Sequence, residues 1–243
     1  MERTMKLMSA MAVVVLLGAC DVSPTVVGPT VAGPAGAVGP ADTGNAADIQ
    51  GTGILATESR DVGGFSRVTL SGVGHLIVEQ GATEALTITA DDNILPLVTA
   101  EVYGDELMLG TLPGTRFASP HNIVYSLTVV DLEALAVLGA AVVEIRRLQT
   151  DRFAIRIDGV AVVTATGRAD EQDVGLAGVA TYDAGGLVSR TVRVEVAGVS
   201  RAVVQARETL EGRVEGQSIV EYIGHPVVNV DVTGGASVRP IDG

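Results

Sequence analysis

One short motif recurs six times in the second half of the chain, and it constrains the fold more than any other feature. Each copy has an aliphatic residue, any residue, glycine, any residue, and then alanine or serine; the glycines are Gly139, Gly159, Gly178, Gly198, Gly216 and Gly234. Successive glycines lie 20, 19, 20, 18 and 18 residues apart. This narrow spacing indicates one structural unit stacked on copies of itself.

The residues before each glycine alternate in the way expected of a strand with one buried face. The second residue before the glycine is valine, isoleucine or leucine in every copy, whereas the third varies and includes Glu195, Arg213 and Asp231. We expect the former position to point inward and the latter to face water. A unit of 18–20 residues is too short for a strand–helix–strand crossover. The expected fold is all-β, a right-handed parallel β-helix or solenoid with coils of about 18–20 residues.

The six glycines are predicted to form corners of these coils. Glycine tolerates a positive φ, or a neighbouring backbone so close that a Cβ would not fit. The outward residues Glu195, Arg213 and Asp231 hold equivalent positions in successive repeats. We therefore expect them to form an acid–base–acid ladder on the outer face.

Residues 51–134 also indicate β structure, with less regular spacing. Apolar and polar residues alternate over 86–89 and 123–129, and Gly104 lies in a predicted turn. Pro96 predicts a short turn over 93–97. The expected domain spans residues 51–243, with irregular N-terminal coils at 51–134 and regular repeats from 135 onward.

The composition is consistent with a core of small aliphatic side chains. Hydrophobic residues make up 47% of the chain and aromatic residues only 3%, with no tryptophan. The formal net charge of −13 opposes the phosphate contacts on which nucleic-acid binding depends. Nucleic acid is therefore not an expected partner.

The N-terminus has the pattern of a bacterial lipoprotein signal. Arg3 and Lys6 precede an apolar run over 7–17, and residues 17–20, Leu-Gly-Ala-Cys, resemble the lipobox, in which cleavage precedes an acylated cysteine. The apolar run is about half as long as a membrane-spanning helix. We expect a signal peptide at 1–19 and lipidation of Cys20, the only cysteine, which anchors the protein to the inner or outer membrane of the cell envelope. An ordinary secretory signal is the alternative.

A linker is expected over residues 20–50. Its prolines are Pro24, Pro29, Pro34 and Pro40, three of them preceded by glycine. Proline at this spacing interrupts both helices and central strands. Such a segment of about 30 residues reaches roughly 30 to 90 Å, which is enough to hold a domain away from a lipid surface.

Several short segments occur in an order found in one family. They are residues 64–68 (GFSRV), 71–74 (SGVG), 80–81 (QG), 90–96 (ADDNILP), the glycine corners, and 222–226 (YIGHP). In this order, over about residues 51–243, the chain resembles the bacterial envelope family described as putative auto-transporter adhesin, head GIN domain. The resemblance implies a β-helical surface or periplasmic domain, and it supplies no catalytic residues.

No catalytic, metal or cofactor motif stands out. The histidines, His75, His121 and His225, are far apart in sequence and have no cysteine partner. Asp91 and Asp92 are expected in a solvated turn. The nucleophile-elbow and phosphate-loop motifs are absent from the sequence.

Two functions from different classes remain. The first is a non-catalytic, lipid-anchored envelope module that binds a protein or a glycan. The alternative is a carbohydrate-active β-helix enzyme, a polysaccharide lyase or hydrolase, which needs clustered carboxylates or arginines on one wall. The binding module is favoured because the candidate acids occupy different columns of the repeat; these acids are Asp158, Asp170, Asp173, Asp183 and Glu195. The sequence leaves the ligand and the oligomeric state open.

Overall fold

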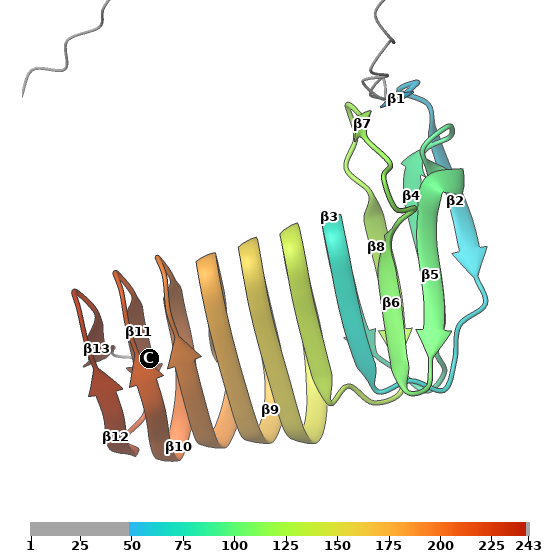
Figure 1. The fold of residues 1–243 in the computed structure, drawn as a ribbon. Coiled ribbons are helices and arrows are strands. Elements are labelled where there is room, and N and C mark those ends of the chain that lie inside the picture. The colour runs from blue at the N-terminus through green and yellow to red at the C-terminus, as the bar shows by residue number, and fades with distance from the viewer. Residues whose placement is uncertain (1–48, 242–243) are drawn as a thin grey trace, which may run out of the picture. The chain divides into compact units, whose positions relative to one another are not determined.

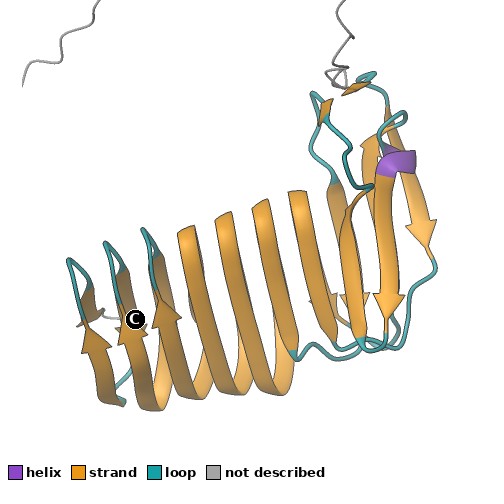
Figure 2. Ribbon diagram, in the orientation of Figure 1, coloured by secondary structure: helices purple, strands orange, loops and turns teal. Residues whose placement is uncertain are grey.

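The computed structural model of the protein describes residues 49–241. Within this range the chain is almost entirely strand and loop, with no α-helix and one short 3₁₀ turn, η1 (Leu95–Leu97), which contains Pro96 (Figure 2). The all-β prediction is confirmed. The predicted signal peptide at 1–19, Cys20 and most of the linker lie outside the described residues.

The repeats stack through parallel strand pairing. The long strand β9 (Ala134–Val196) winds through several turns, and the stack continues with β10 (Arg201–Val214), β11 (Ile219–Ile223), β12 (Val227–Val232) and β13 (Ser237–Pro240) (Figure 1). Arg213 pairs with Glu195 on one side and with Asp231 on the other, each 18 residues away. β11 likewise lies between β10 and β13, parallel to both. Each strand in this part therefore pairs with its equivalent one repeat further on.

A single hydrophobic core runs through the stack. Residues two positions before the first five corner glycines and four positions before the first four, such as Val194 and Val196, are buried, as the alternation predicts. The core is mostly valine, leucine, isoleucine and alanine, with a few fully buried aromatic residues, among them Phe153 and Tyr182. Tyr182 accepts a hydrogen bond of 2.6 Å at Oη from Nε2 of Gln172, and burial raises the pKa of its phenol.

The six predicted corner glycines lie in one column and all have positive φ. A Cβ on Gly159 would lie 2.2 Å from the carbonyl oxygen of Gly139, and one on Gly198 would lie 2.5 Å from that of Gly178. No side chain fits at these distances, because the obstacle is backbone. Gly72 extends the column, since a Cβ on Gly139 would lie 2.2 Å from the carbonyl oxygen of Gly72. The Ser71-Gly72-Val73 sequence resembles the repeat, although Gly72 precedes Gly139 by 67 residues.

The expectation of parallel coils throughout is wrong for the first half, where the sheet is mixed. β3 (Arg67–Gln80) pairs in parallel with β9, β6 (Glu106–Thr111) and β8 (Val124–Val129). Three antiparallel pairs lie beyond it: β2–β4, β4–β8 and β5–β6, where β2 is Leu55–Arg60, β4 is Ala85–Asp91 and β5 is Val98–Tyr103. For the β5–β6 pair the physical reason is connection length. The turn at Gly104 joins β5 to β6 with two residues, and so short a connection permits only antiparallel neighbours.

The first described strand is β1 (Ile49–Gln50), which pairs in parallel with β7 (Phe117–Ala118). The described β structure thus begins two residues before the expected domain start at residue 51.

Near the end of the stack one carboxylate is buried between two arginines. The Glu221 side chain is only 5% exposed, and its oxygens accept hydrogen bonds from Nε of Arg239 at 3.1 Å and from Nε of Arg201 at 2.8 Å. The bond from Arg239 is the main cause that holds the pKa of Glu221 below its usual range; burial opposes it and Arg201 adds to it. This carboxylate therefore joins three strands of the stack.

Candidate functional site

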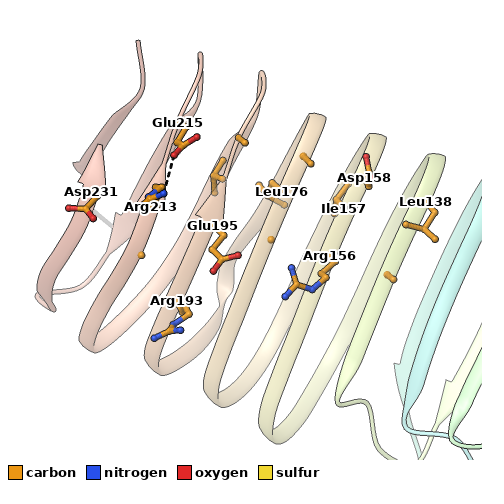
Figure 3. Close-up of a pocket in the computed structure, with 16 residues that line it drawn as sticks. Leu138, Arg156, Ile157, Asp158, Leu176, Arg193, Glu195, Arg213, Glu215 and Asp231 are labelled. Carbon is orange, nitrogen blue, oxygen red and sulfur yellow. Dashed lines mark ion pairs between the residues drawn. The ribbon is translucent and has the colours of Figure 1, made fainter. Parts of the chain in front are cut away.

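The outward face of the strands before the corner glycines carries a long groove. Side chains one, three and five residues before each glycine point to the same side, because successive residues of a strand alternate. Stacking places these columns next to one another along the repeats. A groove of about 930 Å³ runs over them, lined by residues from Leu138 in the first repeat to Asp231 in the last (Figure 3).

The floor of the groove is made of residues with little or no side chain. Ala136 and Gly175 lie in the column three residues before the corners, Ala177 and Ala197 lie in the column one residue before them, and Gly212 lies four residues before its corner. The longer side chains at equivalent positions in neighbouring repeats extend further from the strands than these small residues do. The hollow therefore follows directly from the pattern of small residues in outward positions.

The walls of the groove carry both charges. Three arginines and four carboxylates line it: Arg156, Arg193, Arg213, Asp158, Glu195, Glu215 and Asp231. Nη2 of Arg193 donates to Oε1 of Glu211 in the next repeat at 2.8 Å, and this bond is the main cause that raises the pKa of Arg193. Arg213 pairs at 3.6 Å with Glu215, which lies two residues further along the chain, just past the end of β10 (Figure 3).

Arg156 differs from the other two arginines of the groove. Within residues 49–241 it forms no ion pair, although it lies on an acidic protein. Its guanidinium extends across Gly175, where a Cβ would lie 2.9 Å from Nη1. A smaller hollow of about 280 Å³ surrounds it, with Asp173 and Glu195 in the lining. Arg156 is the cation of this face that is most available to an external acceptor.

The predicted acid–base–acid ladder has the expected strand register, but its arginine forms a different ion pair from those expected. Glu195, Arg213 and Asp231 are aligned across three strands, which confirms the repeat alignment. Arg213, however, forms an ion pair with Glu215, two residues further along the chain, and among the described side chains it forms none with Glu195 or Asp231. A neighbour two positions along an extended strand is on the same face and within reach of a long side chain, so it competes with the partners on adjacent strands.

The candidate acids of the sequence analysis occupy different columns of the repeat. In the structure several of them nevertheless line the same part of the surface. Asp158 and Glu195 line the same groove, and Asp173 lines the adjoining hollow, because columns an even number of positions apart share a face. Asp170 lies elsewhere and pairs with Arg168 at 2.8 Å. The sequence interpretation missed this clustering, and it did not single out Arg193; the even spacing of the outward positions is the signal that could have found both.

The histidines and the paired aspartates lie away from the groove. Nε2 of His75 lies 3.1 Å from Glu144, Nδ1 of His121 lies 2.8 Å from Asp91, and His225 is exposed. Among the described residues, histidine, cysteine and acidic side chains form no cluster that could hold a metal ion.

The expectation of a solvated turn is wrong for Asp91, which is fully buried, whereas Asp92 is exposed. Oδ2 of Asp91 accepts a hydrogen bond of 3.0 Å from the Gly53 backbone N–H. Burial alone would raise the pKa of Asp91, but hydrogen bonds from His121, Gly53 and Ser119 outweigh it and hold that pKa below the usual range. Asp91 thus fastens the residues just after β1 to β4.

No helix in the described range is long and apolar enough to cross a membrane.

Comparisons with known proteins place these features in context. The family model described as "Putative auto-transporter adhesin, head GIN domain" matches residues 64–226. No curated protein sequence matches the chain. The crystal structure of a putative adhesin from Bacteroides fragilis is similar at a TM-score of 0.67 and 22% identity, covering 79% of this chain and 100% of that one. A putative lipid binding protein from Parabacteroides distasonis is similar at a TM-score of 0.54 and 17% identity, covering 80% of this chain and 99% of that one. At these identities the likeness concerns the fold alone.

Proposed function

The chain belongs to the family described as putative auto-transporter adhesin, head GIN domain, and we propose that it is a non-catalytic, lipid-anchored binding module of the bacterial cell envelope. Its ligand, a protein or a glycan, lies in the groove on the outward face of the repeats. The observation that carries this proposal is Arg156, a guanidinium without an ion pair in residues 49–241, lying over a glycine inside that groove.

The lining of the groove suits a ligand that has both apolar and polar parts. Most of its accessible surface is apolar, and the charged side chains of both signs along its walls add hydrogen bonds and charge pairing. Arg156 can offer a planar fork of donors to a carboxylate or carbonyl group. The Parabacteroides distasonis protein is described as a putative lipid binding protein. In this chain the charged side chains that line the groove, Arg156 among them, favour a ligand that also carries polar groups.

We further assign the stack of repeats from residue 134 to a right-handed parallel β-helix with coils of 18–20 residues. The 18-residue offsets between paired strands and the column of corner glycines support this assignment. Such a scaffold holds outward side chains at a fixed repeat of about 4.8 Å, and a rigid array of this kind suits recognition of an extended ligand.

Anchoring through an acylated Cys20 is the other part of the proposal. It rests on the apolar run and lipobox-like residues of the N-terminus, and the proline-rich segment over 20–50 would separate the domain from the lipid. Whether the membrane is the inner or the outer one is left open.

The second candidate function is a polysaccharide-active enzyme, and it is favoured by the presence of Asp158 and Glu195 in one groove. Against it, no aromatic side chain lines the groove, although enzymes and lectins commonly stack sugar rings on aromatic residues. A binding module remains the better account of a groove with this lining.

Site-specific photo-crosslinking in intact cells tests the proposal. A photoreactive amino acid at Ala177, in the groove floor, should give a discrete adduct, and the same label at the exposed Thr164 should not. The adduct should be lost when Arg156→Ala is added. An adduct that forms equally from Thr164, or that is insensitive to Arg156→Ala, would contradict groove binding. Polysaccharide cleavage by the full chain that disappears in Asp158→Asn and Glu195→Gln would instead establish the enzyme.

A further inference from the structure

The charges in and beside the groove do not balance. Three arginines and four carboxylates line it, and two further carboxylates adjoin it: Glu211, which accepts from Arg193, and Asp173 in the smaller hollow. Three positive charges against six negative ones leave a formal excess of three negative charges. This face of the protein therefore attracts cations, because a surface with an excess of one sign raises the local concentration of the other.

Ion pairs within the protein leave most acids of the groove unpaired. Arg193 is bonded to Glu211, and Arg213 pairs with Glu215. Arg156 forms no ion pair within residues 49–241. Three exposed carboxylates of the lining likewise take part in no ion pair or side-chain hydrogen bond with a described residue; they are Asp158, Glu195 and Asp231. A ligand in the groove thus meets one unpaired cation and three unpaired anions.

The strand register fixes the spacing of these unpaired charges. Glu195 and Asp231 pair with Arg213 from either side, so they lie two coils apart, about 9.6 Å at about 4.8 Å per coil (Figure 3). Arg156 holds the same column two coils before Glu195, and Asp158 lies beside it on the same strand. A polypeptide in the polyproline II conformation advances about 9.3 Å in three residues, and every third side chain points the same way. Cationic side chains three residues apart therefore match Glu195 and Asp231.

The other features of the lining favour a polypeptide over a sugar. No aromatic side chain lines the groove for a sugar ring to stack on. Its apolar surface suits the aliphatic stems of lysine and arginine side chains, which can lie on it while their charged ends reach the acids. The guanidinium of Arg156 can donate to a backbone carbonyl oxygen, of which an extended polypeptide offers one per residue.

We propose that the groove binds an extended, basic segment of a partner protein, with lysine or arginine at about every third residue. This inference rests on the groove being the binding site, as proposed above. The basic side chains pair with Glu195, Asp231 and Asp158, and a backbone carbonyl of the segment accepts from Arg156. From the first repeat to the last the groove crosses five coil spacings, about 24 Å, which about eight extended residues span.

A synthetic peptide serves as the probe. It consists of three Lys-Pro-Ala units, is blocked at both ends and carries a fluorescent dye. Its binding to the full chain with Cys20→Ala, in a nonionic detergent that adds no charge, is followed by fluorescence anisotropy. We expect saturable binding that weakens as salt is added, because the pairs are exposed. The same peptide with acetylated lysines keeps its backbone and loses its charge, and it should bind at least about ten-fold more weakly.

Neutral variants locate the binding. Glu195→Gln and Asp231→Asn should each weaken binding of the lysine peptide roughly two- to five-fold, as expected for exposed ion pairs, and both combined with Asp158→Asn about ten-fold or more. The matched control is Asp61→Asn, which removes the same charge from an exposed position outside the groove and should leave the affinity unchanged. All four side chains are exposed, so circular dichroism should show an unchanged fold.

Several results would overturn the proposal. They are failure of the lysine peptide to bind, equal binding of the acetylated peptide, and a loss of affinity in Asp61→Asn as large as in Glu195→Gln. An oligosaccharide of glucosamine that binds where the lysine peptide does not would assign the groove to a cationic glycan.

The photo-crosslinking experiment separates this inference from groove binding itself. An adduct from Ala177 that is lost in Arg156→Ala but survives neutralisation of Asp158, Glu195 and Asp231 would leave groove binding in place and overturn the basic ligand. Loss of the adduct in both variants would support the basic ligand.

Discussion

A comparison of two glycine substitutions tests how the repeats are held together. Gly198 and Gly114 have similar positive φ, +88° and +76°, but different surroundings. A Cβ on Gly198 would lie 2.5 Å from the carbonyl oxygen of Gly178, whereas a Cβ on Gly114 would meet nothing within 4 Å. The pair therefore separates the cost of the backbone conformation from the cost of close packing between repeats.

The magnitudes follow from these distances. An alanine at positive φ costs about 1 kcal/mol, and Gly114→Ala should cost little more than that. In Gly198→Ala the methyl group must also push the two strands apart. The oxygen that it meets accepts the hydrogen bond from Val199 N–H at 2.9 Å, and breaking such a bond leaves partners unsatisfied at about 1–3 kcal/mol. We expect a total loss of about 3 kcal/mol, and a larger one for Gly198→Val or Gly159→Val.

Urea unfolding of the full chain, followed by far-ultraviolet circular dichroism, measures both losses in free energy of unfolding. Equal losses for Gly198→Ala and Gly114→Ala, within about 0.5 kcal/mol, would refute the close-packing argument. A neutral result for both valine substitutions would refute the special backbone conformation as well.

Three further outcomes are expected. Cys20→Ala should move the protein from the detergent phase to the aqueous phase in detergent partitioning and leave the circular dichroism spectrum unchanged; wild-type protein already in the aqueous phase would count against lipidation. Arg213→Glu should lower thermal stability by no more than about 1 kcal/mol, and by less as salt is added, because the new acid lies between Glu195 and Asp231 and makes a row of three exposed acids. Glu221→Gln should destabilise the domain at neutral pH, since two arginines lose their carboxylate. Because the pKa of Glu221 is lowered in the folded protein, its stabilising effect is present above the usual glutamate pKa and is lost as pH falls through the folded pKa. The stability of the variant should therefore change less with pH below about pH 4.5. An identical acid-unfolding profile for the two proteins would contradict this.

The repeated half of the fold could be predicted because its determinants are local. Alternation fixes which residues of a strand point inward, and the spacing of the glycines fixes the register between strands. The alignment of Arg213 with Asp231 follows from these two facts alone. The mixed sheet before residue 134 does not follow from these two facts. Its strand order depends on which distant segments meet, and β3 pairs with segments far from it in sequence.

The groove could be predicted only in part, because it depends on neighbours in space. Gly175 reads in the sequence as an unremarkable outward residue, yet its missing side chain is what leaves room for Arg156. Asp91 shows the same limit: its sequence resembles a polar turn, but His121 and Gly53 approach from other segments and bury it. Competition among ion-pair partners, as at Arg213, is likewise decided by side-chain reach and not by register.

The most direct test of the account is the distance across the stack, since the groove exists only if all six repeats lie in register. Spin labels on Ala136→Cys and Asp231→Cys, in the Cys20→Ala chain, occupy the same outward column five repeats apart. At about 4.8 Å per repeat, pulsed electron paramagnetic resonance should give a narrow distribution near 24 Å, widened by a few ångströms of label. A mean beyond about 35 Å, or a broad distribution without a peak, would contradict the stacked register.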